Sequence, residues 1–138
     1  MSSVVEGRCL CGEYHYKFDR EQVVSAHHCH CKDCQKMTGS GKATIVMVPS
    51  GNLQTSGELK TYTVTGTDGS HVTRGFCPTC GSQLISYVEE MPDLRFVKAG
   101  TMDDSSWVEI DSSFWSDSAE PWSPADIAHT AFPKNPSM

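Results

Sequence analysis

The chain has 138 residues, of which 38% are hydrophobic and 20% charged, and this fits a single domain over residues 1–138. A net charge of −6 without a basic cluster argues against a nucleic-acid partner. No apolar run is long enough to cross a bilayer, and residues 1–6 lack the features of a secretory signal. We therefore expect a cytoplasmic protein without a membrane partner, in which thiols stay reduced.

Short segments of β-type sequence follow one another along the chain. Tyrosine and phenylalanine alternate with polar residues in the first of them, and β-branched residues dominate the second. Turn sequences with glycine, aspartate or proline separate several of the segments. The expected strands cover residues 14–18, 43–48, 59–64, 72–76, 84–88 and 94–97. This succession predicts a mainly β fold.

Helical signal is weak. Ser123 is a suitable N-cap, Pro124 suits the first helical position and Asp126 places an acid in the first turn, so one short C-terminal helix is expected there. The stretch 31–38 could hold one helical turn. We expect the aromatic residues of the last third to pack on the sheet, with the lining of a ligand pocket as the alternative. These residues are Trp107, Phe114, Trp115, Trp122 and Phe132.

The seven cysteines are the strongest functional signal. An odd number in a reducing compartment favours metal ligands over paired disulfides. The first and last groups each end in Cys-Gly, and we expect Gly12 and Gly81 to relieve crowding where the backbone turns back toward the sulfurs. The pattern predicts one closed, structural four-thiolate zinc site. Its ligands would be Cys9, Cys11, Cys77 and Cys80.

Cys29, Cys31 and Cys34 remain as a set of three. Three protein ligands leave one coordination position open, which is typical of a catalytic zinc. In an extended segment His27 would share a face with the first two cysteines and could close the site. Other partitions of the seven thiols between two metals also fit the spacing. A single nucleophilic cysteine beside a histidine is a further alternative.

Positive charge gathers after the central cysteines. Lys32, Lys36 and Lys42 follow them, and within this stretch only Asp33 opposes them. One interpretation is a solvated turn, in which the lysine amino groups reach into water. The other is a small positive rim that suits an anionic ligand.

Three cysteine motifs resemble those of the glutathione-dependent formaldehyde-activating enzyme family, also called the centromere protein V family. The motifs are Gly7-Arg8-Cys9-Leu10-Cys11-Gly12, Cys29-His30-Cys31-Lys32-Asp33-Cys34 with Thr38-Gly39, and Arg74-Gly75-Phe76-Cys77-Pro78-Thr79-Cys80-Gly81. Residues 97–104 and the pair Pro121-Trp122 match as well. The resemblance covers roughly residues 5 to 123, and all seven cysteines match in order and spacing.

The resemblance implies an Mss4-like zinc fold of several small antiparallel β-sheets. It also implies two zinc ions per chain, a structural one at the four-cysteine set and an active-site one at the three-cysteine set. The family's activity joins glutathione, as co-substrate, and formaldehyde into S-hydroxymethylglutathione, a carbon–sulfur lyase reaction. Family members often carry a histidine and an arginine before the Pro-Trp pair, where this chain has Ser112-Ser113-Phe114-Trp115 and Ala119-Glu120. This departure leaves the aldehyde open.

We therefore expect a zinc enzyme that acts on glutathione or on a glutathione–aldehyde adduct, by thiolate or carbonyl activation at the three-cysteine site. Lys32, Lys36 and Arg74 are candidates for holding the carboxylates of glutathione. The expected partner is a small-molecule thiol or aldehyde, and a homodimer is left open. The alternative function is a non-catalytic zinc module that binds a protein.

Overall fold

A computed structural model describes residues 3–126 and 128–136 as a mainly β protein whose strands belong to two sheets. This confirms the predicted fold class. Contacts divide the chain into two compact units, one made of Met1–Val24 with Val46–Trp107 and the other of Ser25–Ile45 with Val108–Met138. The expectation of one domain stays a prediction. Each unit is described by itself below.

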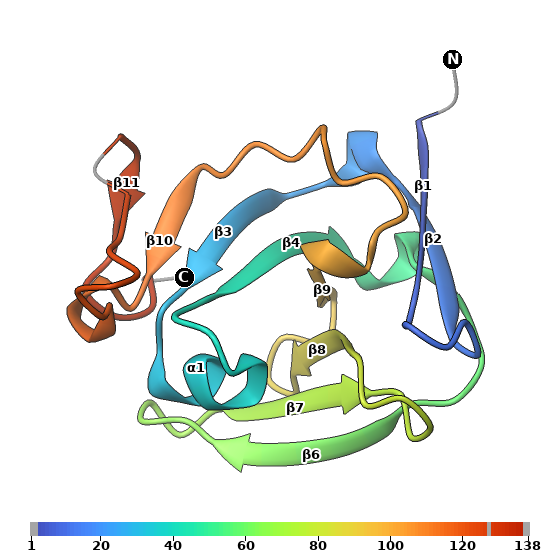
Figure 1. The fold of residues 1–138 in the computed structure, drawn as a ribbon, viewed down its shortest axis with the longest axis horizontal. Helices are drawn as coiled ribbons and strands as arrows, with labels where there is room; N and C mark the ends of the chain where they lie inside the picture. Colours follow the sequence, from blue (N-terminus) through green and yellow to red (C-terminus); the bar gives the residue numbers. More distant parts are fainter. Residues whose placement is uncertain (1–2, 127, 137–138) are drawn as a thin grey trace. The chain divides into compact units, whose positions relative to one another are not determined.

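The first unit holds two groups of antiparallel strands (Figure 1). One is a three-stranded sheet with the order β1-β2-β5, and the other has the strand order β9-β8-β7-β6. Four of the predicted strands correspond to β6 to β9, and a fifth corresponds to β2. The bounds are β1 Val4–Arg8, β2 His15–Asp19, β5 Gln54–Ser56, β6 Lys60–Thr65, β7 His71–Phe76, β8 Gln83–Val88 and β9 Leu94–Lys98.

Alternating burial explains the pairing of β1 with β2. Val5 faces inward opposite Phe18, and Tyr16 lies two residues before Phe18 on the same side of its strand. Trp107 and Phe18 meet in a T-shaped contact, with 6.4 Å between ring centroids, and Trp107 donates its indole N–H to the Asp104 carbonyl. This tryptophan therefore packs on the sheet, as expected.

The second unit is built around β3 (Ser25–Cys29), with the strand order β11-β10-β3 (Figure 1). Strand β10 (Ser112–Phe114) runs parallel to both β3 and β11 (Thr130–Ala131). The sheets are therefore not purely antiparallel, because these strands are distant in sequence and no tight hairpin joins them. Strand β4 (Ala43–Pro49), a predicted strand, carries the boundary between the units.

The one α-helix of the described residues is α1 (Lys32–Thr38), where only a single turn was expected. Its N-cap is Cys31, whose sulfur accepts the Cys34 N–H, and it ends at Gly39 in the left-handed conformation. The Thr38 hydroxyl donates to the Cys34 carbonyl. In the described ranges, no helix combines the length and apolar character needed to span a membrane.

The predicted C-terminal helix is wrong for the residues described. Ser123 instead pairs with Glu120 in an isolated bridge, and its N–H donates to the Glu120 carbonyl. The Asp126 side chain accepts the Ala128 N–H in a turn of its own, which competes with a helical first turn. Because β11 begins at Thr130, the segment has no room for a stable helix.

Candidate metal centres

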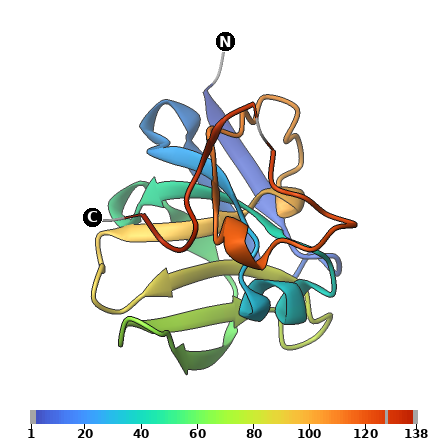
Figure 2. The same cartoon turned by 90° about the vertical axis from the view of Figure 1, so that its left-hand side faces the viewer.

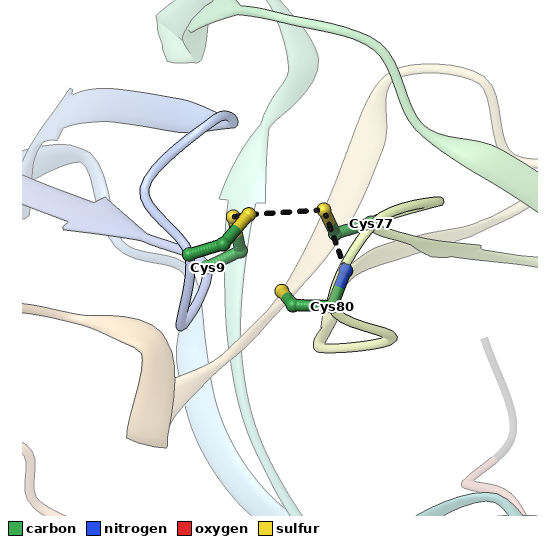
Figure 3. A group of neighbouring side chains, drawn as sticks. Cys9, Cys77 and Cys80 are labelled. Carbon is green, nitrogen blue, oxygen red and sulfur yellow. Dashed lines mark hydrogen bonds between the residues drawn. The ribbon is translucent and has the colours of Figure 1, made fainter.

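The first candidate centre brings together Cys9 and Cys11, on the loop between β1 and β2, with Cys77 and Cys80, on the loop after β7. All four sulfurs lie within 4.8 Å of one another. The Cys11 sulfur is 3.6 Å from that of Cys9 and 3.7 Å from that of Cys77. Figure 3 shows the side chains of the two loops pointing toward a common centre. Four thiols at this separation match the donor set of a closed zinc site.

Backbone and hydroxyl groups surround these sulfurs. The amide of Tyr14 donates to Cys9 and that of Cys80 donates to Cys77, at 3.4 and 3.5 Å. The Ser82 hydroxyl lies 3.2 Å from the Cys80 sulfur and accepts the Leu10 N–H, so it joins the two loops. Hydrogen bonds from Ser82 lower the pKa of Cys80 to about 5. Sequence reasoning missed Ser82, although it directly follows the motif.

The expectation that Gly12 and Gly81 relieve steric crowding is wrong. A Cβ added at Gly12 or Gly81 would meet nothing within 4 Å, so crowding is not relieved there. Both residues have positive φ, +83° and +77° respectively. Each donates its N–H back to the carbonyl of the group's first cysteine, Cys9 or Cys77. Glycine is needed because the left-handed turn disfavours any side chain.

The second candidate centre consists of Cys29, Cys31 and Cys34. Their sulfurs also lie within 4.8 Å of one another. They come from the end of β3, the N-cap of α1 and the first turn of α1, and the Cys34 amide donates to the Cys31 sulfur at 3.3 Å. Cys29 and Cys34 are buried, and Cys31 is half-buried. The structure thus brings together the same two sets that the spacing predicted.

The electrostatics of the second centre also suit a cation. Hydrogen bonds to Cys31 and Cys34, followed by burial, raise the pKa of the Cys29 thiol. Three adjacent thiols repel one another when ionised, so all three become thiolates only beside a positive charge. Thiolates are the soft ligands that zinc accepts. The residues present therefore fit a bound zinc ion.

His27 does not complete this centre. Among the described residues, no histidine nitrogen or carboxylate oxygen lies within 4.8 Å of all three sulfurs. The His27 ring instead stacks on Phe114, with ring centroids 3.8 Å apart and planes inclined by 11°. Phe114 occupies the position on β10 opposite Cys29, and its ring also meets Phe132 edge to face. The His27 ring is thus packed against Phe114 and is not part of the cluster.

The rings of three other histidines, His28, His30 and His129, contact one another near the three-cysteine set. His28 and His30 alternate with Cys29 along the chain, and their rings meet edge to face. Burial, and then the positive charge of Lys42, lower the pKa of His28 to about 4. The His129 ring lies 6.3 Å from that of His28. The positive charge of Lys42 therefore disfavours the protonated form of His28.

The candidate glutathione contacts are dispersed. Lys32 and Lys36 lie on α1, within the unit that holds the second centre. The Lys32 amino group forms an ion pair with Glu120, whereas the Lys36 side chain is exposed. Arg74 lies in β7 of the first unit, where it is 7% exposed.

The fold and the two thiol clusters define a mainly β protein with two candidate metal centres. The sequence model of the glutathione-dependent formaldehyde-activating enzyme family matches residues 4–118. The chain belongs to this family, which supports a glutathione-related, formaldehyde-activating function in general terms.

A solved structure shares the fold. It is the crystal structure of a Rhodobacter sphaeroides protein from Northeast Structural Genomics, with a TM-score of 0.56 and 21% sequence identity. The similarity covers 71% of this chain and 87% of that one, and at this identity it shows the fold alone. A search of curated proteins found no match.

Proposed function

We propose that this chain is a zinc-dependent carbon–sulfur lyase that makes or breaks the bond between the sulfur of glutathione and an aldehyde carbon. The observation that carries the proposal is the three-thiol cluster. Its sulfurs are close enough to share one ion, and in the part of the chain described no histidine, carboxylate or further cysteine offers a fourth ligand atom within the same distance. Three protein ligands with one open position are typical of catalytic rather than structural zinc.

Cys29, Cys31 and Cys34 would hold the active-site zinc, and the four-cysteine set would hold a structural one. When bound, the active-site ion supplies a positive charge that stabilises a thiolate or polarises a carbonyl. The Cys34 amide, by donating to Cys31, keeps that sulfur oriented within the cluster. Burial of Cys29 and Cys34 limits the access of water to their sulfurs.

The reaction is an addition in which no atom is lost. In the forward direction the thiol sulfur bonds to the carbonyl carbon, the carbonyl π bond breaks, and its oxygen takes the proton that the thiol gave up. Lys36 is exposed on α1 and suits a glutathione carboxylate, whereas Lys32 would first have to leave Glu120. Arg74 is the third candidate for a carboxylate contact. A cytosolic location would keep all seven thiols reduced.

Zinc analysis of the purified chain, with and without glutathione, tests this proposal. We expect two zinc ions per chain, and X-ray absorption at the zinc edge should report one added sulfur ligand when glutathione is present. Two zinc ions that keep their ligands in excess glutathione would contradict thiolate activation. One zinc ion per chain would contradict the two-centre assignment.

The activity has its own measurement, because glutathione and formaldehyde also combine without a catalyst. Exchange spectroscopy by NMR gives the rate of interconversion between glutathione and its hydroxymethyl adduct. We expect the wild-type chain to accelerate exchange above the uncatalysed rate, and Cys31→Ser to return it to that rate. Other aldehydes can then be compared in the same assay.

A further inference from the structure

Gln35 occupies a position that the spacing of the cysteines does not explain. Its side-chain amide nitrogen donates to two backbone carbonyls, that of His30 at 2.8 Å and that of Ser118 at 2.9 Å. His30 lies between two of the cluster cysteines, and Ser118 ends the 3₁₀ turn Ser116–Ser118 that follows β10. One amide group therefore joins the cysteine loop to a segment that is distant in sequence.

The same loop is also held on its other side. The His30 N–H donates to the Phe114 carbonyl at 3.0 Å, next to the position where β10 pairs with Cys29. Both backbone polar groups of His30 are thus fixed, one by β10 and one by Gln35. The His30 side chain is 0% exposed, which restricts its peptide further. In Figure 2 the 3₁₀ turn lies beside α1, as the bond to Ser118 requires.

We propose that Gln35 is a positioning residue for the three-thiol cluster. By fixing the peptide between Cys29 and Cys31, it holds their sulfurs at the separation that one metal ion needs. Groups that orient the ligands of a metal typically change its affinity about 10- to 100-fold when removed. This inference rests on the proposed function, since it takes the second cluster to be a zinc site.

Two substitutions of Gln35 separate its hydrogen bonds from its volume. Gln35→Met keeps the length of the side chain and removes both N–H donors. Gln35→Glu keeps the shape but places a carboxylate against two carbonyl oxygens, so we expect it to be the more damaging change. Gln22→Met, at an exposed position of the 3₁₀ turn Arg20–Gln22, is the matched control.

Zinc affinity is measured on the full chain by competition with a chelating dye. Alkylation of the thiols that lose zinc, followed by peptide mapping, shows which of the two clusters has released its zinc ion. For Gln35→Met we expect about 10- to 100-fold weaker zinc binding at Cys29, Cys31 and Cys34, unchanged binding at the other four cysteines, and an unchanged control.

Unchanged zinc affinity at the second cluster in both Gln35 variants would overturn the inference. Equal weakening at both clusters, or loss of the folded state, would also overturn it, because Gln35 would then be a general stabilising residue. If the wild-type chain holds zinc only at the four-cysteine cluster, the proposed function fails first. The two failures are therefore distinguishable.

Discussion

The two thiol clusters are similar in the separation of their sulfurs and different in what holds them. At the four-cysteine cluster, neighbouring backbone amides and the Ser82 hydroxyl contact the sulfurs from the same two loops. At the three-cysteine cluster, much of the support comes from residues distant in sequence, through the pairing of Phe114 with Cys29 and the Gln35 bond to Ser118. The four-cysteine cluster is thus held by its own two loops, whereas the three-cysteine cluster also depends on a strand and a turn that carry none of its cysteines.

The largest expected effect comes from one substitution made in each cluster. Cys80→Ser should unfold the domain, because a metal at four thiolates can contribute about 10–16 kcal/mol to folding. That is as large as the whole stability of an ordinary domain, about 5–15 kcal/mol. Cys31→Ser should abolish turnover and leave the fold largely intact. Circular dichroism, thermal unfolding and zinc content check both variants.

Equal unfolding of both variants would remove the distinction between a structural and an active-site centre. The comparison is well matched, since the exchange of sulfur for oxygen is the same and both cysteines are half-buried. Full activity of Cys31→Ser with two zinc ions still bound would contradict the role of the second cluster instead.

A smaller loss of stability is expected from a substitution in β10 of the second unit. Ser113 is 0% exposed, and its hydroxyl shares a 2.8 Å hydrogen bond with His129 Nε2. Ser113→Ala removes one partner of a part-buried hydrogen bond, which should lower the free energy of unfolding by about 1 kcal/mol. Chemical denaturation measures this, with the exposed Ser40→Ala as control. A loss no larger than that of the control would show that the hydrogen bond adds little.

The grouping of the cysteines could be predicted because each loop carries a local signal. Cys-x-x-Cys before Gly81 and Cys-x-Cys before Gly12 describe short turns that need no knowledge of distant contacts. Alternation of aromatic and polar residues likewise predicted β2, and short segments on either side of turn sequences predicted β6 to β9.

Part of what the sequence did not predict depends on long-range pairing. The three-residue strand β10 is too short to show a period, and its parallel partner β3 is distant along the chain. Gln35 has no motif of its own, since its partners are backbone carbonyls that any residue could supply. The helix expected at Ser123 failed for a local reason instead, because a bridge to Glu120, three residues earlier, overrides its capping pattern.

The turns of the four-cysteine cluster give a finer test. Gly81→Ala places a Cβ at φ +77° with open space around it, so only the backbone conformation is penalised. We expect a loss of about 1 kcal/mol, from a left-handed penalty of about 1–2 kcal/mol partly offset by reduced freedom of the unfolded chain. Gly51→Ala is the control, because that site is equally open and has no positive φ. Thermal unfolding of the zinc-loaded chains should rank Gly81→Ala as the less stable.

The smallest expected effect concerns a third group of potential ligands, His71 with Glu89 and Glu90, whose ligand atoms also lie within 4.8 Å. Here His71 Nδ1 is already paired with Glu90 at 2.8 Å, and both side chains are about half exposed. The hydrogen bond raises the pKa of His71 and lowers that of Glu90. The contribution of His71 to the stability of the fold is fully present below the unfolded pKa of histidine, about 6.5, and is lost as the pH rises through the pKa that His71 has in the folded chain. The glutamate contribution is present above about 4.3 and is lost as the pH falls.

The pair should therefore stabilise the fold most between about pH 4.3 and 6.5. His71→Gln should lower the melting temperature slightly at pH 5.5 and not at pH 9, with zinc content unchanged. Loss of a zinc ion in this variant would make the group a third metal centre. Without that loss, proximity of ligand atoms alone does not define a centre in this chain. What sets the two thiol clusters apart is that adjacent thiolates repel one another, whereas His71, when protonated, supplies a cation to Glu90.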